Sequence, residues 1–529
     1  MVTRRNVLAG AAALGLLPLA ARNTRAADAD LDVAVIGGGA SGAYTAWRLR
    51  TTTPQTRVRL FEMSDRIGGR LRSIAFPQAP HLFGEAGGMR FLEAQRHVFP
   101  LVKHLGLPAR EYPIQEPQDR LALRGRSFAY SEIGRPDTLF PYNIPAIDQA
   151  PNSDLYIRAM ERIFPGARRM TADKWRKIRA TVRYKGRLLK DWSAWTLFAD
   201  AITHEEIDFL TDSIGYDDLF MHETGLDAFD YTFLGDDESK TFYTIPDGYQ
   251  RLPQTLASEA GKLGAPINMQ TQLVSLVVPD SADGVFTLGF VDSNGRLATL
   301  TASRVVLAMP RHAIETIANF PALNNPKLAD LIASVDPVPA CKALLLYPNA
   351  WWSGMGIEGG RSITDMPARQ FFALGAEHAR MPMEPSNGYG MLMMYCDANS
   401  VEYWREMVDA PKPDAAGFQW LDGNSQLASE VHRQAGLVFN TAPPAPLAAC
   451  FQDWTADPFG GGWHFWGKGK DSAELAGTLL KPIPDRHLYI CGEAYAAYAA
   501  AGWVEGALER AETMLQKHFA LPAPDWLKA

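Results

Sequence analysis

LDVAVIGGGASG, at residues 31–42, is the stretch that decides the fold class of this chain. Its first six residues are mostly apolar and predict a short buried strand, and a helical pattern follows the glycines. Gly37 allows a tight turn, Gly39 lets the backbone approach a pyrophosphate, and Gly42 lets the helix pack closely on the strand. Strand, glycine loop and helix in this order predict a Rossmann-like dinucleotide site. The residues predicted to line this loop are Gly37, Gly39, Ala40, Ser41 and Gly42.

A second strand and the loop after it extend this site. The apolar stretch at residues 58–61 ends at Glu62, twenty residues beyond Gly42, where a carboxylate can accept hydrogen bonds from a ribose diol. The loop SDRIGGR follows at residues 64–70. Its glycines, Gly69 among them, let the chain approach a second part of a cofactor, and its arginines, Arg70 among them, can neutralise phosphate. This loop indicates FAD rather than NAD.

The far end of the chain carries a related segment. The stretch HLYICGE at 487–493 predicts a strand that ends at an acid, and AGWVEGAL at 501–508 opens a helix. Together with the two segments near the N-terminus, this one resembles the flavin amine oxidases, which bind FAD. The resemblance implies that Glu493 contacts the ribityl and pyrophosphate part of FAD. It also implies that Trp503 lines the flavin and that Val504 offers its N–H to the ring.

FGEAGGMRF, at residues 83–91, carries the clearest indication of a substrate. It resembles the Gly-x-Met-Arg segment of the L-amino acid oxidases and of the related amino-acid monooxygenases, in which the arginine binds the α-carboxylate of the substrate. A planar guanidinium holds a carboxylate by two hydrogen bonds and fixes its plane. The resemblance therefore implies that Arg90 binds the substrate and that Gly88 and Met89 lie against FAD. An ordinary salt bridge is the alternative role for Arg90.

The stretch VPACKAL, at residues 338–344, resembles the family strand whose lysine holds a water at flavin N5. Lys342 is the match, although a lysine at the end of a strand is more often simply solvated. With Arg90 and Trp503, this lysine completes the set of candidate catalytic residues.

One segment departs from the amino acid oxidase pattern. Those oxidases place a tyrosine near the end of the segment that corresponds to residues 364–373, where it shares the carboxylate with the arginine. This chain has Phe372 there and therefore no phenol hydroxyl. Tyr395, or else Tyr495 or Tyr498, is the expected substitute; without one, either the carboxylate is held more weakly or the substrate differs. The residues expected at the substrate are Arg90, Phe372, Tyr395, Gly502 and Trp503.

The combined interpretation is an FAD-dependent oxidase that converts L-amino acids and O2 to 2-oxo acids, ammonia and hydrogen peroxide. Two enzymatic alternatives stay open: an amine oxidase acting on substrates without a carboxylate, and an amino-acid 2-monooxygenase that forms an amide. A flavin-stabilised scaffold would need neither Arg90 nor Lys342 and is disfavoured. The residues assigned to the cofactor are Gly37, Gly39, Ala40, Ser41, Gly42, Glu62, Gly69, Arg70, Gly88, Met89, Gly492, Glu493, Trp503 and Val504.

Composition excludes several other classes of protein. The chain has 529 residues, of which 47% are apolar and 21% charged, and a net charge of −7, so no general basicity supports binding of nucleic acid. The four cysteines are far apart and form no C-x-x-C pair, which excludes a local cysteine metal cage; we expect no metal site. Each cysteine lies among apolar residues, which favours buried free thiols, and one disulfide stays open. We expect a homodimer or a higher homo-oligomer.

The N-terminus resembles an export signal. Arg4 and Arg5 precede an apolar run at residues 7–21, which is too short to span a bilayer comfortably. The small residues at 27–29 suit cleavage, and the paired arginines favour the twin-arginine route, which exports folded proteins. We therefore expect a signal peptide at 1–29, no stable membrane insertion, and a periplasmic or secreted mature protein of net charge −10.

The cofactor segments are scattered along the chain, so the expected α/β fold has a discontinuous, Rossmann-like FAD-binding domain. A substrate-binding domain, mostly antiparallel sheet, and a helical insertion complete the expected organisation. The expected boundaries are 30–92, 240–325 and 450–520 for the FAD-binding domain, 93–150 and 326–449 for the substrate-binding domain, and 151–239 for the helical domain.

The helical region is strongly polarised in charge. Residues 158–190 carry a net charge of +10, and residues 200–238 hold 13 acids and no Lys or Arg. A basic run can bind nucleic acid or anionic lipid, but we expect the two stretches to compensate each other, within one subunit or across a dimer. A weaker hypothesis is that the acidic stretch borders a substrate funnel and favours cationic substrates.

Overall fold

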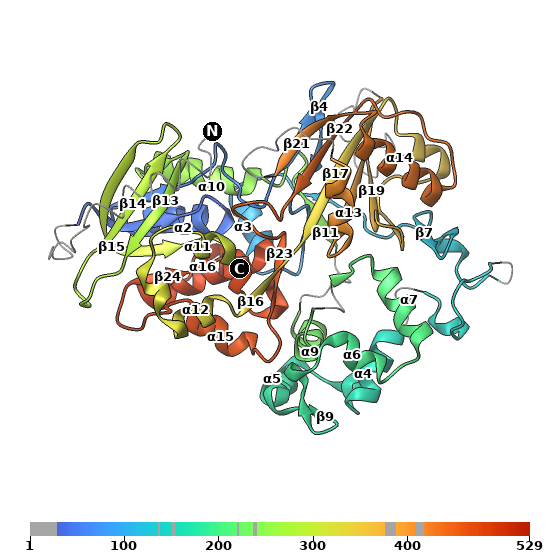
Figure 1. Cartoon of the computed structure of the whole chain (residues 1–529), viewed down its shortest axis with the longest axis horizontal. Helices are drawn as coiled ribbons and strands as arrows, with labels where there is room; N and C mark the ends of the chain where they lie inside the picture. Colours follow the sequence, from blue (N-terminus) through green and yellow to red (C-terminus); the bar gives the residue numbers. More distant parts are fainter. Residues whose placement is uncertain are drawn as a thin grey trace.

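Two large sheets and a group of helices make up the molecule (Figure 1). The computed structural model describes residues 29–135, 138–150, 154–218, 222–235, 241–375, 388–408 and 417–528. The expected signal peptide, apart from its last residue, lies outside the described residues. In Figure 1 the first sheet lies on the left, the second at the upper right, and the helices between residues 155 and 234 at the lower right.

The first sheet has seven strands and confirms the predicted Rossmann-like fold class. Its order is β12-β2-β1-β15-β14-β13, with β24 beside β15, and the five strands β12, β2, β1, β15 and β24 run parallel. The bounds are β1 Leu31–Ile36, β2 Val58–Phe61, β12 Ile267–Asn268, β13 Thr271–Val277, β14 Phe286–Asp292, β15 Leu297–Leu307 and β24 Leu488–Ile490. Strands from both ends of the chain therefore meet in one sheet.

Helices cover both faces of this sheet, which explains why β1 is apolar on both sides. Val33 and Val35 pack in one buried cluster, whereas Ala34 and Ile36 pack in another on the opposite face. The first cluster includes residues of α2 (Ala40–Thr52), α10 (Arg251–Lys262) and α16 (Val504–Phe519). The second includes residues of α11 (Arg311–Glu315), α12 (Pro326–Ile332) and α15 (Ser472–Leu479).

The second sheet has eight strands in the order β21-β22-β17-β20-β19-β18-β7-β8. Its neighbouring strands are antiparallel except for the parallel pair of β18 and β7. The bounds are β7 Arg120–Leu123, β8 Arg126–Ala129, β17 Ala340–Tyr347, β18 Arg361–Thr364, β19 Gln370–Leu374, β20 Gly390–Asp397, β21 Phe418–Asp422 and β22 Ala448–Asp453. Strand β22 crosses the expected domain boundary at residue 450 and stays in this sheet, because its ladder with β17 continues to Asp453.

The two faces of the second sheet have different cover. α14 (Gln426–Phe439) packs on one face, and the hairpin of β3 (Ser73–Phe76) and β4 (Ala79–Glu85) contributes to the buried cluster on the other. All four cysteines are buried free thiols. Cys341 and Cys396 are opposite each other on β17 and β20, with their Sγ atoms 3.1 Å apart.

The helices at the lower right of Figure 1 surround their own apolar cluster, which includes Trp175, Phe198 and Phe229. Their bounds are α4 Leu155–Ile163, α5 Ala172–Ile178, α6 Ala194–Ala199, α7 His204–Ile214 and α9 Gly225–Leu234, with a small hairpin of β9 (Arg183–Tyr184) and β10 (Arg187–Leu188). Thr203 and Thr224 cap α7 and α9 by accepting hydrogen bonds from backbone N–H groups in the first turn.

The charged stretches of this region compensate each other only in part. Two ion pairs, Arg179 with Asp230 and Lys185 with Asp200, join the basic stretch to the acidic one. Other acids of the second stretch pair elsewhere: Glu205 and Asp208 bind Arg124, and Asp217 binds Arg369.

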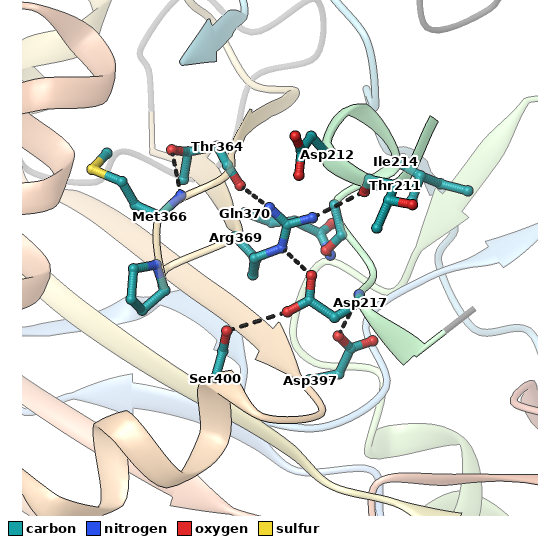
Figure 2. Close-up of polar contacts among 12 residues, drawn as sticks. Thr211, Asp212, Ile214, Asp217, Thr364, Met366, Arg369, Gln370, Asp397 and Ser400 are labelled. Carbon is teal, nitrogen blue, oxygen red and sulfur yellow. Dashed lines mark hydrogen bonds and ion pairs between the residues drawn. The ribbon is translucent and has the colours of Figure 1, made fainter. Parts of the chain in front are cut away.

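Arg369 joins the helices to the second sheet (Figure 2). Its Nε lies 2.7 Å from Asp217, just after α7, and its other nitrogens donate to the carbonyls of Thr211 and Thr364. The backbone N–H of Asp217 donates to Asp397 at 2.8 Å. Arg369 is 2% exposed and the Asp217 side chain is half-buried, so an ion pair with a buried arginine adds to the apolar packing between the helices and the sheet.

Short elements connect these parts. They are β5 Phe91–Leu92, β6 Arg110–Glu111, β11 Phe242–Thr244, β16 Val335–Val338, β23 Trp463–Trp466, α3 Val98–His104, α13 Ser400–Glu406 and α17 Asp525–Lys528. β5, β11 and β6 form a three-stranded sheet, and β16 pairs with β23. Among the helices of the described residues, none has the length and apolar character needed to cross a bilayer.

Candidate active site

The glycine loop after β1 is shaped by close backbone contacts. Gly37 has a φ of +106°, and a Cβ there would lie 2.5 Å from the carbonyl oxygen of Ala308. A Cβ on Gly42 would lie 1.9 Å from the carbonyl oxygen of Gly37. Gly39 is different, because a Cβ there would meet only Gly69, at 3.8 Å. The loop is therefore crowded where the helix packs and open where an anion would approach the start of α2.

A cavity of about 230 Å³ lies at this loop. Glu62, at the end of β2, borders it and accepts hydrogen bonds from the N–H of Gly38 at 2.7 Å and from Ser64. The predicted cofactor residues on its wall are Gly37, Gly39, Ala40, Ser41, Glu62, Gly69, Arg70, Gly88, Gly492, Glu493, Trp503 and Val504. Gly42 does not line the cavity; its role is to let α2 pack closely against the loop.

A larger cavity of about 1140 Å³ adjoins the first. The two share six lining residues, namely Arg70, Gly88, Gly462, Gly502, Trp503 and Val504. Glycines and buried acids line the smaller cavity, and aromatic side chains line the larger one. The glycine loop and Arg70 would hold the phosphates of a dinucleotide, and Trp503 would lie against its ring system.

Glu493 has a dense set of partners between the two cavities. Its carboxylate lies 2.7 Å from Arg70 and accepts hydrogen bonds from the N–H groups of His464 and Gly502, at 3.1 and 3.0 Å. Burial alone would raise the pKa of Glu493, but Arg70 and His464 outweigh it and lower the pKa to about 2. Glu493 is therefore a fixed negative charge. This role of His464 could not be predicted from the sequence, since the residue lies 29 positions before Glu493 on a separate strand.

The larger cavity has aromatic walls. Trp503 stacks at 6.2 Å on Phe242 of β11. Tyr216 contacts both Tyr395 and Trp463 edge-on, at 5.6 and 6.2 Å between ring centroids. The position of Tyr216 in the cavity could not be predicted from the sequence, because it belongs to the loop after α7 and no motif surrounds it.

Arg90 lines the larger cavity next to two aromatic rings. Its guanidinium carbon lies 5.0 Å from the ring centre of Phe242 and 5.8 Å from that of Phe372. Met89 lines the cavity beside it. A guanidinium over aromatic faces gains cation–π stabilisation and keeps a defined plane. Phe372, which the sequence placed at the substrate, is not itself a lining residue of the cavity; it is buried next to Arg90 in the same apolar cluster as Met89.

The expected substitutes for the missing phenol lie in different places. Tyr395 lines the larger cavity. Tyr495 does not, because its hydroxyl donates to the carbonyl of Ile332 in the core behind the first sheet. The side chain of Tyr498 lies outside the described part of the chain.

Lys342 occupies the floor of the larger cavity, directly opposite Tyr395 in the ladder of β17 and β20. Its Nζ donates to the carbonyls of Gly87 at 2.6 Å and Glu85 at 3.1 Å. Burial lowers the pKa of Lys342 to about 7, although Glu85 acts in the opposite direction; Arg90 adds to the lowering. Lys342 therefore titrates near neutral pH.

Glu85 is a site residue that the sequence did not single out. It is buried, and its carboxylate accepts from the N–H of Tyr249 at 2.7 Å and from the hydroxyl of Ser73 at 2.8 Å. Burial raises its pKa to about 7. Its place within the quoted segment at 83–91 was the one available signal.

Acidic and basic groups line the mouth of the same cavity. Of the acidic stretch at 200–238, Glu223 lies on the wall, and the residues at 236–238 fall outside the described ones. Further charges come from Arg110, Glu111, Glu116, Glu358 and Arg361. The described residues contain no group of three or more His, Cys, Asp and Glu side chains arranged to hold a metal ion.

Comparison with known proteins agrees with this geometry. The sequence pattern of the family described as flavin containing amine oxidoreductase matches residues 40–513. The chain is 25% identical to aplysianin-A of Aplysia kurodai, over 93% of this chain and 91% of that protein. It is 25% identical to achacin of Lissachatina fulica, over 92% and 93%. It is 23% identical to an L-amino-acid oxidase of Bungarus fasciatus, over 71% and 68%.

A solved structure shares the whole fold. Putrescine oxidase with bound putrescine superposes with a TM-score of 0.69 over 93% of this chain and 99% of that one, at 16% identity. The family match covers most of the sequence, and the glycine loop, the buried acids and the aromatic cavity fit a bound flavin. The chain belongs to the flavin-containing amine oxidoreductase family.

Proposed function

We propose that the protein is an FAD-dependent oxidase of L-amino acids. The reaction takes an amino acid, water and O2 to a 2-oxo acid, ammonia and hydrogen peroxide. The observation that carries the proposal is the position of Arg90, in the same cavity as Trp503 and Lys342 and between two aromatic rings. The relatives that are named L-amino-acid oxidases support the same substrate class.

Arg90 would bind the carboxylate of the substrate. Two N–H groups of a guanidinium match the two oxygens of a carboxylate, and the rings of Phe242 and Phe372 keep the guanidinium from rotating away. Trp503 borders the substrate on the side of the flavin. Anchoring one end of a small substrate fixes the direction of its Cα–H bond, which is the main contribution that binding makes to such a reaction.

Lys342 would place a water. When bound, the flavin accepts the hydride equivalent and returns the electrons to O2. An ammonium group has three donors, and two of those of Lys342 go to the carbonyls of Glu85 and Gly87. The third is then available for a water in the cavity. As pH rises through the pKa of about 7, the amine becomes neutral and can accept a proton from that water or from the substrate.

Peroxide release by the purified protein tests the proposal. The substrates are the L-amino acids and, as matched controls, the amines formed from them by loss of the carboxylate. Peroxide with amino acids, and much less with the amines, is the expected result. Peroxide with the amines alone would replace the proposal by an amine oxidase. An amide product without peroxide would indicate a monooxygenase.

Export and assembly are part of the same proposal. Arg4-Arg5 and the apolar run after them support twin-arginine export. Replacing both arginines by lysine should retain the protein in the cytoplasm, whereas an exported variant would argue against this route. We propose a homo-oligomer for the mature protein, which sedimentation velocity measures directly.

A further inference from the structure

We propose that Tyr112 is a second substrate-binding residue, whose phenol donates to the same carboxylate as Arg90. This inference rests on the proposed oxidation of amino acids and assigns a residue that neither the sequence nor the relatives indicated. The site needs a further hydrogen-bond donor, because Phe372 offers no hydroxyl and a carboxylate has more lone pairs than one guanidinium can satisfy.

Tyr112 and Arg90 both lie beside Phe372, and the backbone of Tyr112 is bonded to that of Phe242. Tyr112 follows β6, and its N–H donates to the carbonyl of Phe242 at 2.8 Å. Its ring centre lies 6.3 Å from that of Phe372. The Arg90 guanidinium faces the rings of the same two phenylalanines, at 5.0 and 5.8 Å. Both side chains line the larger cavity, so the phenol and the guanidinium border one space.

The hydroxyl of Tyr112 has only a weak partner among the described residues. The side chain is 9% exposed, and its hydroxyl donates to the Sδ of Met89 at 3.8 Å. A thioether sulfur is a weak acceptor, so a carboxylate that enters the cavity would be a much better one. Burial raises the pKa of Tyr112, against the effect of the Arg90 charge, and the phenol therefore stays a donor at neutral pH.

The other cavity phenols with described ring contacts have different neighbours. The ring of Tyr395 lies 5.0 Å from the ammonium of Lys342 and contacts Tyr216 edge-on, and Tyr216 in turn contacts Trp463. The rings of Tyr249 and Tyr156 contact Phe91 and Phe198. Tyr112 has its described ring contact with Phe372, which also faces the Arg90 guanidinium, and it can supply the hydroxyl that Phe372 lacks.

A second donor would change what the site can discriminate. The guanidinium alone fixes the plane of the carboxylate, and a phenol that donates to a remaining lone pair also resists its displacement in that plane. Hydrogen bonds to charged groups contribute more than neutral ones. Tyr112 should therefore favour substrates that carry a carboxylate and be irrelevant to those that lack one.

The test uses the flavin-loaded Tyr112→Phe variant, which keeps the ring and removes the hydroxyl. We expect its KM for an L-amino acid to rise roughly 10-fold to 100-fold, with little change in kcat/KM for the matching decarboxylated amine. Tyr347→Phe is the control, because it removes an equally buried phenol that bonds His432 on the far side of β17.

A binding measurement separates this inference from the proposed function. Benzoate is an unreactive carboxylate, and its dissociation constant is read from the absorbance of the bound flavin. If benzoate binds Tyr112→Phe more weakly than it binds the wild type and Tyr347→Phe, the result supports a carboxylate-binding role for Tyr112 even if no amino acid is oxidised. If the wild type oxidises amino acids, and Tyr112→Phe changes neither KM nor benzoate affinity, the role of Tyr112 is overturned and the proposed function stands.

Discussion

Lys342 and Glu85 share a buried region of the active site, yet the ammonium of Lys342 bonds the backbone carbonyl of Glu85 rather than its carboxylate. The carboxylate points to Tyr249 and Ser73 instead. Burial raises the pKa of the acid and lowers that of the lysine, so that both lie at about 7. The charge of each group therefore influences the pKa of the other, although no hydrogen bond between the described atoms joins the carboxylate to the ammonium.

The first prediction concerns this pair. Because the pKa of Lys342 is lowered to about 7, the neutral amine appears as pH rises through 7, and turnover should rise over the same interval. Lys342→Met should lose this inflection and reoxidise flavin at least tenfold more slowly, as rapid mixing with O2 would show. Glu85→Gln removes the charge that raises the pKa of Lys342, so the inflection should move to lower pH. Lys262→Met, on the surface, is the control, and an unchanged inflection in Lys342→Met contradicts the assignment.

The second prediction concerns Arg90. Arg90→Lys keeps the charge but loses the planar fork, and Arg90→Ala loses both. We expect kcat/KM for an L-amino acid to fall roughly 100-fold or more in the alanine variant, with less than a threefold change for the decarboxylated amine. Steady-state peroxide assays on paired substrates measure both. Equal losses on the two substrates would instead show that Arg90 supports the structure.

The third prediction concerns the Arg70–Glu493 pair. The pKa of Glu493 is lowered to about 2 in the folded protein from 4.5, so its contribution to stability is present above pH 4.5 and is lost as pH falls from 4.5 to 2. The shift corresponds to about 3 kcal/mol. In Glu493→Gln, the free energy of unfolding should fall less steeply as pH decreases from 4.5 to 2, and flavin should be released more readily on ultrafiltration. If the acid dependence of the variant is identical to that of the wild type, other carboxylates cause it.

The fourth prediction concerns the junction drawn in Figure 2. Arg369→Gln removes a buried arginine that pairs with the half-buried Asp217 and donates to two carbonyls, and it should lower the free energy of unfolding by about 2 kcal/mol. It should also expose residues after α7 to limited proteolysis. Arg405→Gln breaks a pair whose arginine is 44% exposed and should cost less than about 1 kcal/mol. Similar losses in both variants would mean that the junction depends on apolar packing.

The parts of the site that the sequence could predict are those encoded in short segments. The loop from Gly37 to Gly42 needs its glycines for contacts a few residues away, and its strand, turn and helix appear where the pattern predicts them. Arg90 and Lys342 could be found because each lies in a segment that resembles a known one. Their positions in the same cavity could not be derived from their spacing in the sequence, since 252 residues separate them.

The parts that the sequence could not predict depend on contacts between distant elements. His464 meets Glu493 because β23 pairs with β16 and not with β24. Tyr112 meets Phe372 because the short β6 pairs with β11 beside the second sheet. An isolated tyrosine after a two-residue strand carries no periodic signal. The same applies to the charged stretches: among the described residues, some acids pair with the basic run and others with Arg124 and Arg369 outside it.

The meeting of both chain ends in the first sheet has a consequence for synthesis. The cofactor cavity needs the glycine loop after β1 and also Trp503 and Val504, which lie far along the chain at the start of α16. At typical elongation rates, translation of the intervening residues takes roughly half a minute to a minute and a half. A nascent chain therefore cannot complete its cofactor cavity until α16 has left the ribosome, and stable binding of FAD has to follow that point.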